Sequence, residues 1–407
     1  MNDRTMLREL AAQYAECAQS PLNAQRLKLH RAVNDRRMER PVVLIDEIPW
    51  GEYESESQLK LQCKGKAERD IERFLRYRLF QWKHFPGDMV FLPFFPVMKK
   101  IDMGSIGIEI IENTRPSSTG THIMAHEYID QLAHDEDLEK LHFQKITYNK
   151  EASLKDLAFA AEIFGDLLPV RLCGSNPNPS FWDRIAMYRG VTPMLADLYD
   201  RPEFTHALME RMTNIYLDAL RQLTELECLE SWNAAIHCTA AAVSDLSVPD
   251  PGSRVEPKHL WGRSMAQIFA TVSPSMHDEF EIQYAKRTLA PFGLVYYGCC
   301  EPLHNKIDIL EKLPNLRKIG VTPWADPDIA AEKMGSRYVM AFKPNPAFVA
   351  VPDGLDAART EIRRALAACR RNNTSCDIVL KDISTTGLDW QRLAEWEQMA
   401  MHEACSQ

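Results

Sequence analysis

Short apolar runs that alternate with helical stretches constrain the fold of this chain more than any other feature of its sequence. Between most of the runs, apolar residues recur every 3–4 positions, which is typical of amphipathic helices. Strands that are apolar on both faces and alternate with helices indicate a parallel sheet covered by helices. Eight such runs favour a closed (β/α)8 barrel (TIM barrel). An open doubly wound sheet is the alternative, although no Gly-x-Gly-x-x-Gly motif follows the early strands. The runs span residues 40–46, 89–95, 168–173, 228–233, 293–299, 316–322, 338–343 and 376–381.

The pattern divides the chain into a helical N-terminal extension, a barrel and a short tail. Residues 1–40 are charged and helical in character, with Leu7, Leu10 and Tyr14 at helical spacing. This extension is also a candidate element of a homodimer. The barrel is predicted over 41–395, and residues 396–407 are predicted as a C-terminal tail. The polar stretch 98–160 fits the alternation of strands and helices least, so we interpret it as an insertion in the barrel.

Composition disfavours several classes of protein. The formal net charge of −9 argues against nucleic acid as a partner, because phosphate binding rests on Lys and Arg. The chain has no apolar run of about 18 residues that predicts a membrane helix, and its first 20 residues lack the apolar core of a signal peptide. The ten cysteines do not have the spacing of a disulfide framework. We therefore expect a cytoplasmic protein with reduced thiols.

Polar residues follow most of the predicted strands, where a parallel barrel places its active site. We predict that these residues bind a small-molecule substrate, and that the two lysines among them neutralise a carboxylate or phosphate. The alternatives are packing for the aromatic residues and for the histidine, and an ion pair with a nearby aspartate for the lysines. The predicted residues are Glu47, Trp50, Asn233, His237, Trp324, Asp326, Lys343, Asn345, Lys381 and Asp382.

The strongest local signal is the segment Tyr296-Tyr-Gly-Cys-Cys-Glu-Pro-Leu-His304. Zinc sites use Cys, His and carboxylate ligands, and catalytic sites leave one position open. A zinc-bound thiol or alcohol loses its proton and becomes a nucleophile for methyl transfer. We therefore predict Cys299, Cys300, Glu301 and His304 as catalytic residues and candidate zinc ligands. Both cysteines reach one metal only if the strand has ended before them, because neighbouring side chains in a strand point to opposite faces. A metal-free polar pocket and simple packing of Cys299 are the alternatives.

The stretch 292–346 resembles the uroporphyrinogen-decarboxylase-like family that is found beside corrinoid methyltransfer systems. The resemblance rests on Tyr297-Gly-Cys-Cys-Glu-Pro-Leu303, Val321-Thr-Pro-Trp-Ala-Asp326 and Lys343-Pro-Asn-Pro346. Further matches run from Glu47-Ile-Pro-Trp50 to Leu380-Lys-Asp-Ile383. The resemblance implies one barrel with an N-terminal helical extension. It also implies transfer of a methyl group between a small methylated substrate and a corrinoid (cobalamin) carried by a partner protein.

Two departures from the family pattern separate the functions that the resemblance allows. True decarboxylases of this family carry an Arg-rich segment after the first strand, which grips the substrate's carboxylates. Residues 44–52 here read Leu-Ile-Asp-Glu-Ile-Pro-Trp-Gly-Glu, and these acids repel a polyanion. Zinc methyltransferases of the family carry His-x-Cys where this chain has Tyr297-Gly-Cys299, so one expected zinc ligand is absent. The sequence favours a methyltransferase. A decarboxylase of a smaller acid and a non-catalytic barrel that binds a corrinoid or a partner are the alternatives.

Overall fold

The computed structural model describes residues 2–116, 124–232, 234–250 and 252–406. At its centre lies a six-stranded sheet in the order β1-β14-β13-β12-β11-β10, in which every neighbouring pair is parallel. Most of its residues are buried, as expected for a parallel sheet covered on both faces. In sheet order the strands are β1 (Val42–Ile45), β14 (Ser375–Leu380), β13 (Val339–Phe342), β12 (Leu316–Val321), β11 (Leu294–Tyr297) and β10 (Trp261–Ser264).

The remaining predicted strands pair apart from this sheet. β2 (Phe95–Met98) and β7 (Val170–Cys173) form a parallel pair. The predicted strand 228–233 contributes one parallel bridge, between Ser175 and Leu229. β10 was not predicted, because its sequence Trp-Gly-Arg-Ser lacks the apolar character of its neighbours. The fold is thus mixed α/β around a parallel sheet, and the strand hydrogen bonds within the described ranges do not run around a complete barrel.

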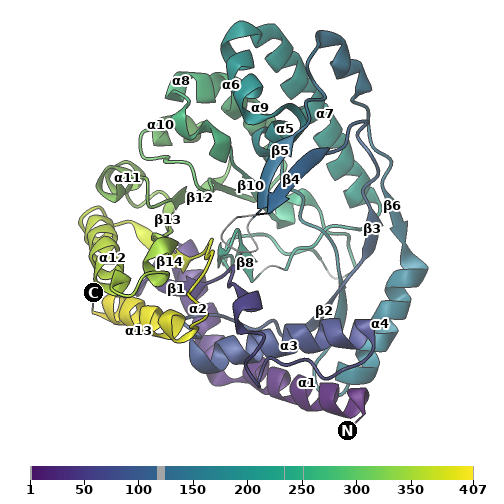
Figure 1. The fold of residues 1–407 in the computed structure, drawn as a ribbon, viewed down its shortest axis with the longest axis vertical. Coiled ribbons are helices and arrows are strands. Elements are labelled where there is room, and N and C mark those ends of the chain that lie inside the picture. Colours follow the sequence, from purple (N-terminus) through teal and green to yellow (C-terminus); the bar gives the residue numbers. More distant parts are fainter. Residues whose placement is uncertain (1, 117–123, 233, 251, 407) are drawn as a thin grey trace.

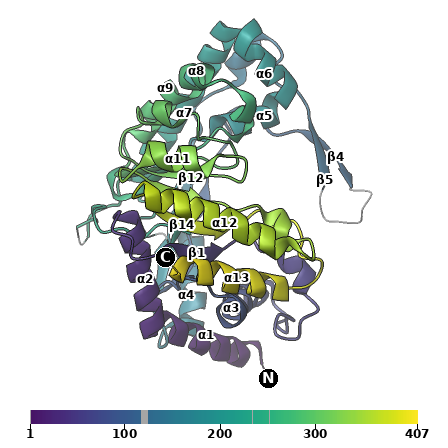
Figure 2. The same cartoon turned by 90° about the vertical axis from the view of Figure 1, so that its left-hand side faces the viewer.

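Helices cover the outer face of the sheet in chain order. Figure 2 shows α11 (Pro327–Met334), α12 (Gly354–Arg371) and α13 (Gln391–Cys405) beside one another. α12 is amphipathic: Ala358, Ile362, Ala365 and Leu366 are buried at helical spacing, and most of its charged residues face outward. α13 takes in most of the segment predicted as a tail. The α-helices that precede α11 from residue 181 onward are α5 (Phe181–Arg189), α6 (Val191–Asp200), α7 (Pro202–Glu225), α8 (Pro274–His277), α9 (Gln283–Leu289) and α10 (Ile307–Leu310).

The N-terminal extension folds as two helices, α1 (Asp3–Gln19) and α2 (Pro21–Asn34). Ser20 separates them: its hydroxyl accepts the Asn23 N–H at 3.1 Å as an N-cap, and Pro21 suits the first turn of the second helix. α1 packs against α3 (Lys66–His84) and α4 (Lys150–Phe164), and Leu7 and Tyr14 are buried in the contact. The extension therefore packs against the helices that follow it, and it lies below the sheet in the view of Figure 1.

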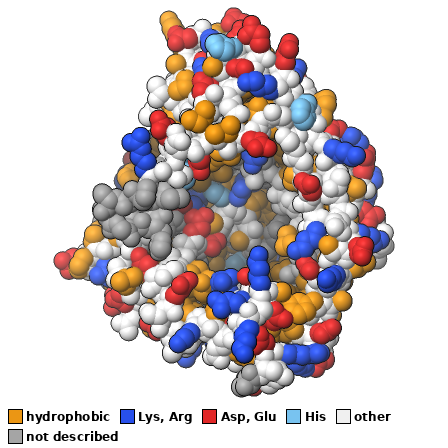
Figure 3. Space-filling model, turned by 45° about the vertical axis from the view of Figure 1, so that its right-hand side comes forward, with side chains coloured by type: hydrophobic (Ala, Val, Ile, Leu, Met, Phe, Trp, Pro, Cys, Tyr) orange, Lys and Arg blue, Asp and Glu red, His pale blue; other side chains and the backbone are white. Residues whose placement is uncertain are grey.

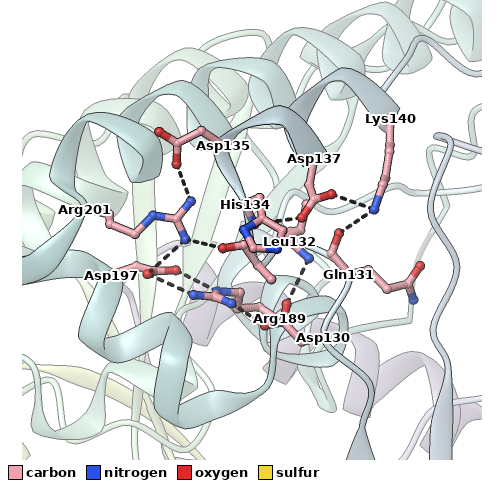
Figure 4. Close-up of polar contacts among 11 residues, drawn as sticks. Asp130, Gln131, Leu132, His134, Asp135, Asp137, Lys140, Arg189, Asp197 and Arg201 are labelled. Carbon is pink, nitrogen blue, oxygen red and sulfur yellow. Dashed lines mark hydrogen bonds and ion pairs between the residues drawn. The ribbon is translucent and has the colours of Figure 1, made fainter.

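The predicted insertion contains two antiparallel strand pairs, which are β3 (Lys100–Asp102) with β6 (Thr147–Asn149) and β4 (Glu112–Pro116) with β5 (Met124–Tyr128). The 3₁₀ helix η2 (Asp135–Lys140) follows. Arg189 pairs with Asp130 and with Asp197, the latter at 2.8 Å, and Arg201 joins Asp197 to Asp135 (Figure 4). These ion pairs fix the base of the insertion to α5, α6 and the start of α7.

Short elements complete the structure. They are η1 (Trp50–Tyr53), β8 (Ala235–Ile236), β9 (Thr239–Ala240), η3 (Pro257–His259), η4 (Gln267–Thr271), the π-helical segment η5 (Asp278–Ile282) and η6 (Pro346–Val349). None of the described helices has the length and apolar content needed to cross a bilayer. The face of the molecule drawn in Figure 3 is deeply hollowed, and basic, acidic and histidine side chains are visible in the hollow.

Candidate active site

A cavity of about 470 Å³ lies where β11, β12, β13 and β14 end. We call it the strand-end cavity. Because these parallel strands all end at one edge of the sheet, residues far apart in sequence converge there. Seven of the predicted site residues line it, namely Cys299, Cys300, Trp324, Lys343, Asn345, Lys381 and Asp382. Thr322, Pro323, Pro344, Pro346, Ala347, Ala350, Ser384 and Thr385 complete the lining.

The two adjacent cysteines lie on a turn rather than on a strand. β11 ends at Tyr297, and Gly298 has a φ of +112°, a conformation that residues with a side chain rarely adopt. A Cβ at Gly298 would also lie 2.7 Å from a methyl carbon of Leu303. The turn brings the sulfurs of Cys299 and Cys300 to 3.5 Å from each other. The strand has therefore ended before the cysteines, and both sulfurs face the same cavity.

The two thiols differ in acidity. A hydrogen bond from the Cys300 thiol lowers the pKa of Cys299, and the charges of Lys343 and Lys381 lower it further, against the opposing effect of burial. The pKa of Cys300 is raised by that same hydrogen bond and by burial. Cys299 is thus the more acidic thiol of the pair, and Cys300 the less acidic one. A thiolate beside lysine is the reactive form of cysteine.

Two lysines flank the sulfurs. The Nζ of Lys343 donates to the Cys299 carbonyl at 3.1 Å, and burial lowers the pKa of this lysine. The Nζ of Lys381 lies 2.6 Å from Asp382 and 3.2 Å from Glu47. Burial opposes the charge of Lys381, but its hydrogen bond to Asp382 and the charges of Cys299 and Glu47 raise its pKa. An ion pair that the sequence left as an alternative, Lys381 with Asp382, is therefore present.

Backbone strain gathers around the same edge of the sheet. Glu47, His237, Cys238 and Asp382 all have positive φ, between +47° and +67°. Glu47 connects two of the others: it accepts the Asp382 N–H at 3.1 Å and lies 3.5 Å from the Cys238 sulfur. Non-glycine residues in this conformation persist only where the surroundings enforce it, and they cluster at functional sites. Glu47 therefore belongs to the edge of the site, although it does not line the cavity.

Glu301 and His304 do not line the strand-end cavity. The Glu301 carboxylate is fully buried, and it accepts the N–H of Cys299 at 2.8 Å and that of Ala266 at 3.1 Å. The Glu301 carboxylate therefore fixes the backbone of the cysteine turn on the side away from the cavity. His304 lies in the following loop, where its Nδ1 is buried without a hydrogen-bond partner.

The other predicted residues have local structural contacts. Trp50 stacks on Tyr77 with ring centroids 4.3 Å apart, in an aromatic cluster away from the cavity. Asp326 caps the N-terminus of α11 and pairs with Arg364 at 2.8 Å. His237 accepts from Arg263 at 3.2 Å through Nδ1, since a guanidinium only donates. Burial and neighbouring cations lower the pKa of His237, so this ring is neutral. Asn233 lies outside the described residues.

A buried group of carboxylates behind the cysteine turn was not predicted. Glu281 on the π-helical segment has one buried oxygen without a partner, and so does Asp183 on α5. Burial, together with the charges of the other acids, raises the pKa of Glu281 to about 8 and that of Asp183 to about 7. π-Helical turns are frequent at functional sites. The sequence shows only acids within a helical pattern here, which is an ordinary surface signal.

The described residues do not form a zinc site at the cysteines. Nowhere in the described ranges do three His, Cys, Asp or Glu side chains lie so that they could hold a metal ion. At the cysteines themselves, Glu301 is bonded to backbone N–H groups, and the cations of Lys343 and Lys381 oppose a further positive charge. The residues therefore do not fit the expected zinc.

A second hollow, of about 560 Å³, adjoins the cavity from the side of α5. We call it the side hollow. Asp183, Met187 and Gln267 lie in its wall. Cys300 and Trp324 line both this hollow and the strand-end cavity. The exposed indole of Trp324 therefore stands at the boundary between them.

The comparisons by sequence give no match, whereas the comparison of structures does. No protein-family model matches the chain, and no curated protein matches it. Among solved structures, the chain is similar to a methyltransferase from Methanosarcina mazei, with a TM-score of 0.48 and 12% sequence identity. That similarity covers 92% of this chain and 98% of the other.

Proposed function

We propose that this protein is a methyltransferase of the uroporphyrinogen-decarboxylase-like class. It moves a methyl group between a small methylated substrate and a corrinoid that a partner protein carries. The observation that supports the proposal most is the Cys299 sulfur, which lies in the strand-end cavity beside two lysines that lower its pKa. In this proposal the six-stranded sheet, the β2–β7 pair and the bridge at Leu229 are arcs of one barrel.

In the proposed reaction the Cys299 sulfur receives the methyl group and then passes it on. The thiolate attacks the methyl carbon, a sulfur–carbon bond forms, and the electron pair of the broken bond leaves with the donor. When the methyl group moves to the acceptor, the sulfur departs as a thiolate. The Cys300 hydrogen bond and the lysine charges stabilise this thiolate in both steps, because a thiol of lower pKa is a better leaving group.

The remaining cavity residues would hold the substrate. The Lys343 and Lys381 ammonium groups attract an anionic group, and Trp324 with the prolines gives an apolar wall for the methyl end. The corrinoid is a co-substrate here, and its role is to donate or accept the methyl group at the cavity mouth. A reducing cytoplasm keeps both thiols available.

Transfer of an isotopically labelled methyl group to the Cys299 sulfur tests this function. Protein is incubated with ¹³C-methylcobalamin, and the peptide that carries residues 299 and 300 is analysed by mass spectrometry while the corrinoid absorbance is followed. We expect the label on Cys299, and no label in Cys299→Ser. Cys405→Ser, which changes an exposed thiol at the end of α13, is the matched control and retains labelling. Demethylation of the corrinoid at an unchanged rate in Cys299→Ser refutes the proposed role of the sulfur.

A decarboxylase of a small acid is the second candidate, and the pair of lysines in the cavity favours it. Lys343 and Lys381 would hold the carboxylate, and Asp382 beside Lys381 would take part in proton transfer to the carbanion. Release of carbon dioxide from candidate acids in the absence of any corrinoid distinguishes this reaction. A non-catalytic barrel would bind ligand with neither methyl transfer nor carbon dioxide release.

A further inference from the structure

The adjacent cysteines form a two-sulfur site that is prepared for a single bridging atom. Their separation of 3.5 Å exceeds the ~2.05 Å of a disulfide bond, so both thiols are free. An atom about 2.3 Å from each sulfur, a typical metal–sulfur length, would subtend an angle of about 100° at that separation. Trivalent arsenic is pyramidal and has bond angles near this value.

The charges around the sulfurs select against a divalent cation. Lys343 and Lys381 both act on Cys299, and no third Cys, His or carboxylate ligand joins the two sulfurs among the described residues. A divalent metal ion would therefore be repelled by two ammonium groups and held by two ligands. A hydrated trivalent arsenical is neutral, so the lysines do not oppose it, and two sulfurs are all the ligands it needs.

We propose that Cys299 and Cys300 together bind a trivalent organoarsenical, R–As(OH)₂, as a cyclic dithioarsenite. Two As–O bonds break, two As–S bonds form, and two water molecules leave. The two thiols supply the two hydrogens that complete these waters, so the step balances with the arsenical and the two cysteines alone. Arsenic remains trivalent, so the step needs no oxidant or reductant.

The surroundings of the sulfurs suit both the leaving protons and the organic substituent. Asp382 lies 3.6 Å from the Cys300 sulfur and is positioned to take its proton. The apolar part of the strand-end cavity, formed by Trp324, Pro344, Pro346, Ala347 and Ala350, faces the same sulfurs and accommodates a methyl or phenyl group. Binding at this site does not depend on the proposed methyl transfer.

The test uses phenylarsine oxide with the full-length protein. Titration calorimetry and native mass spectrometry should show one arsenical per chain, with the mass of the hydrated reagent less two waters. Peptide mapping should place it on residues 299 and 300. Cys299→Ser and Cys300→Ser should each weaken binding by about 10²–10⁴-fold, because the second bond of the wild-type site forms within one complex. Cys405→Ser should bind as the wild type does, and thermal melting checks that each variant is folded.

A competition experiment with wild-type protein tests the same site without substitution. The dithiol 2,3-dimercaptopropanol should release the arsenical, and an equal thiol concentration of 2-mercaptoethanol should not. Cys369 and Cys376 are a second pair of cysteines, both buried, whose side chains hydrogen-bond to each other. Binding that survives in Cys300→Ser, or an adduct on Cys369 and Cys376, overturns the proposal. The corrinoid labelling experiment is read out separately, so failure of one proposal leaves the other result intact.

Discussion

The buried ion pair between Lys318 and Asp377 allows a quantitative test of how the sheet is held together. Lys318 lies on β12 and Asp377 on β14, and both side chains are completely buried. The Lys318 Nζ lies 2.7 Å from the Asp377 carboxylate, and it also donates to the Ala240 carbonyl at 2.8 Å. The pair thus connects two strands whose ends line the strand-end cavity.

Removing one partner leaves a buried charge without compensation. In Lys318→Met the Asp377 carboxylate keeps only the Ala240 N–H, at 3.1 Å. The loss for a broken buried pair is about 3–5 kcal/mol of unfolding free energy. In the double variant Lys318→Met, Asp377→Leu both charges are gone, so we expect it to be more stable than Lys318→Met.

Equilibrium urea unfolding of the wild type, both single variants and the double variant gives the coupling energy of the pair. Lys333→Met is the matched control, since it breaks the exposed pair with Asp308 and should cost about 1 kcal/mol or less. This reasoning would be refuted if the losses of unfolding free energy in the two single variants simply added in the double variant. A loss of unfolding free energy below about 1 kcal/mol in Lys318→Met would refute it as well.

Two further predictions concern titration of the site. Because Lys343 lowers the pKa of Cys299, Lys343→Gln should move the pH midpoint for alkylation of Cys299 by iodoacetamide upward; an unchanged midpoint, measured by peptide mass spectrometry, contradicts the assigned charge effect. Burial raises the pKa of Glu281 from 4.5 to about 8, so between these values the native state keeps a proton that the unfolded state loses. The stability that this proton contributes is full below pH 4.5 and is lost as pH rises through about 8. Melting temperatures of Glu281→Gln should therefore fall less than those of the wild type between pH 5 and 8, and parallel curves would show that Glu281 does not titrate in this range.

The strands near the cavity were predictable because their sequence signal is local. β11 to β14 are mainly apolar runs, each followed by polar residues that line the cavity, so Lys343 and Lys381 could be placed from the sequence. β10 could not be placed this way, because its pairing with β11 rather than its composition makes it a strand. Within its described residues the predicted strand 228–233 shows one parallel bridge, at Leu229, because a strand pattern alone does not supply a ladder of partners.

Side-chain direction limited the prediction of the site. Glu301 follows the cysteines directly, yet its carboxylate points away from the cavity to backbone N–H groups. Asp326 follows β12 and serves as a helix cap. Spacing along the chain shows that such residues lie near a strand end, but the turn geometry decides which way each one faces. Glu281 depends on contacts with residues almost 100 positions away, such as Asp183, which no local pattern reports.

The boundary at Trp324 has a consequence for the order in which molecules arrive. Cys300 is reached from the strand-end cavity and from the side hollow, and the indole stands between the two spaces. A molecule bound in one compartment leaves the other entrance open, so the two reactants can enter by different routes. Because the methyl group rests on Cys299 between the two transfers, steady-state velocities measured with two substrates would still give parallel reciprocal lines, as in a ping-pong mechanism with two separate binding compartments.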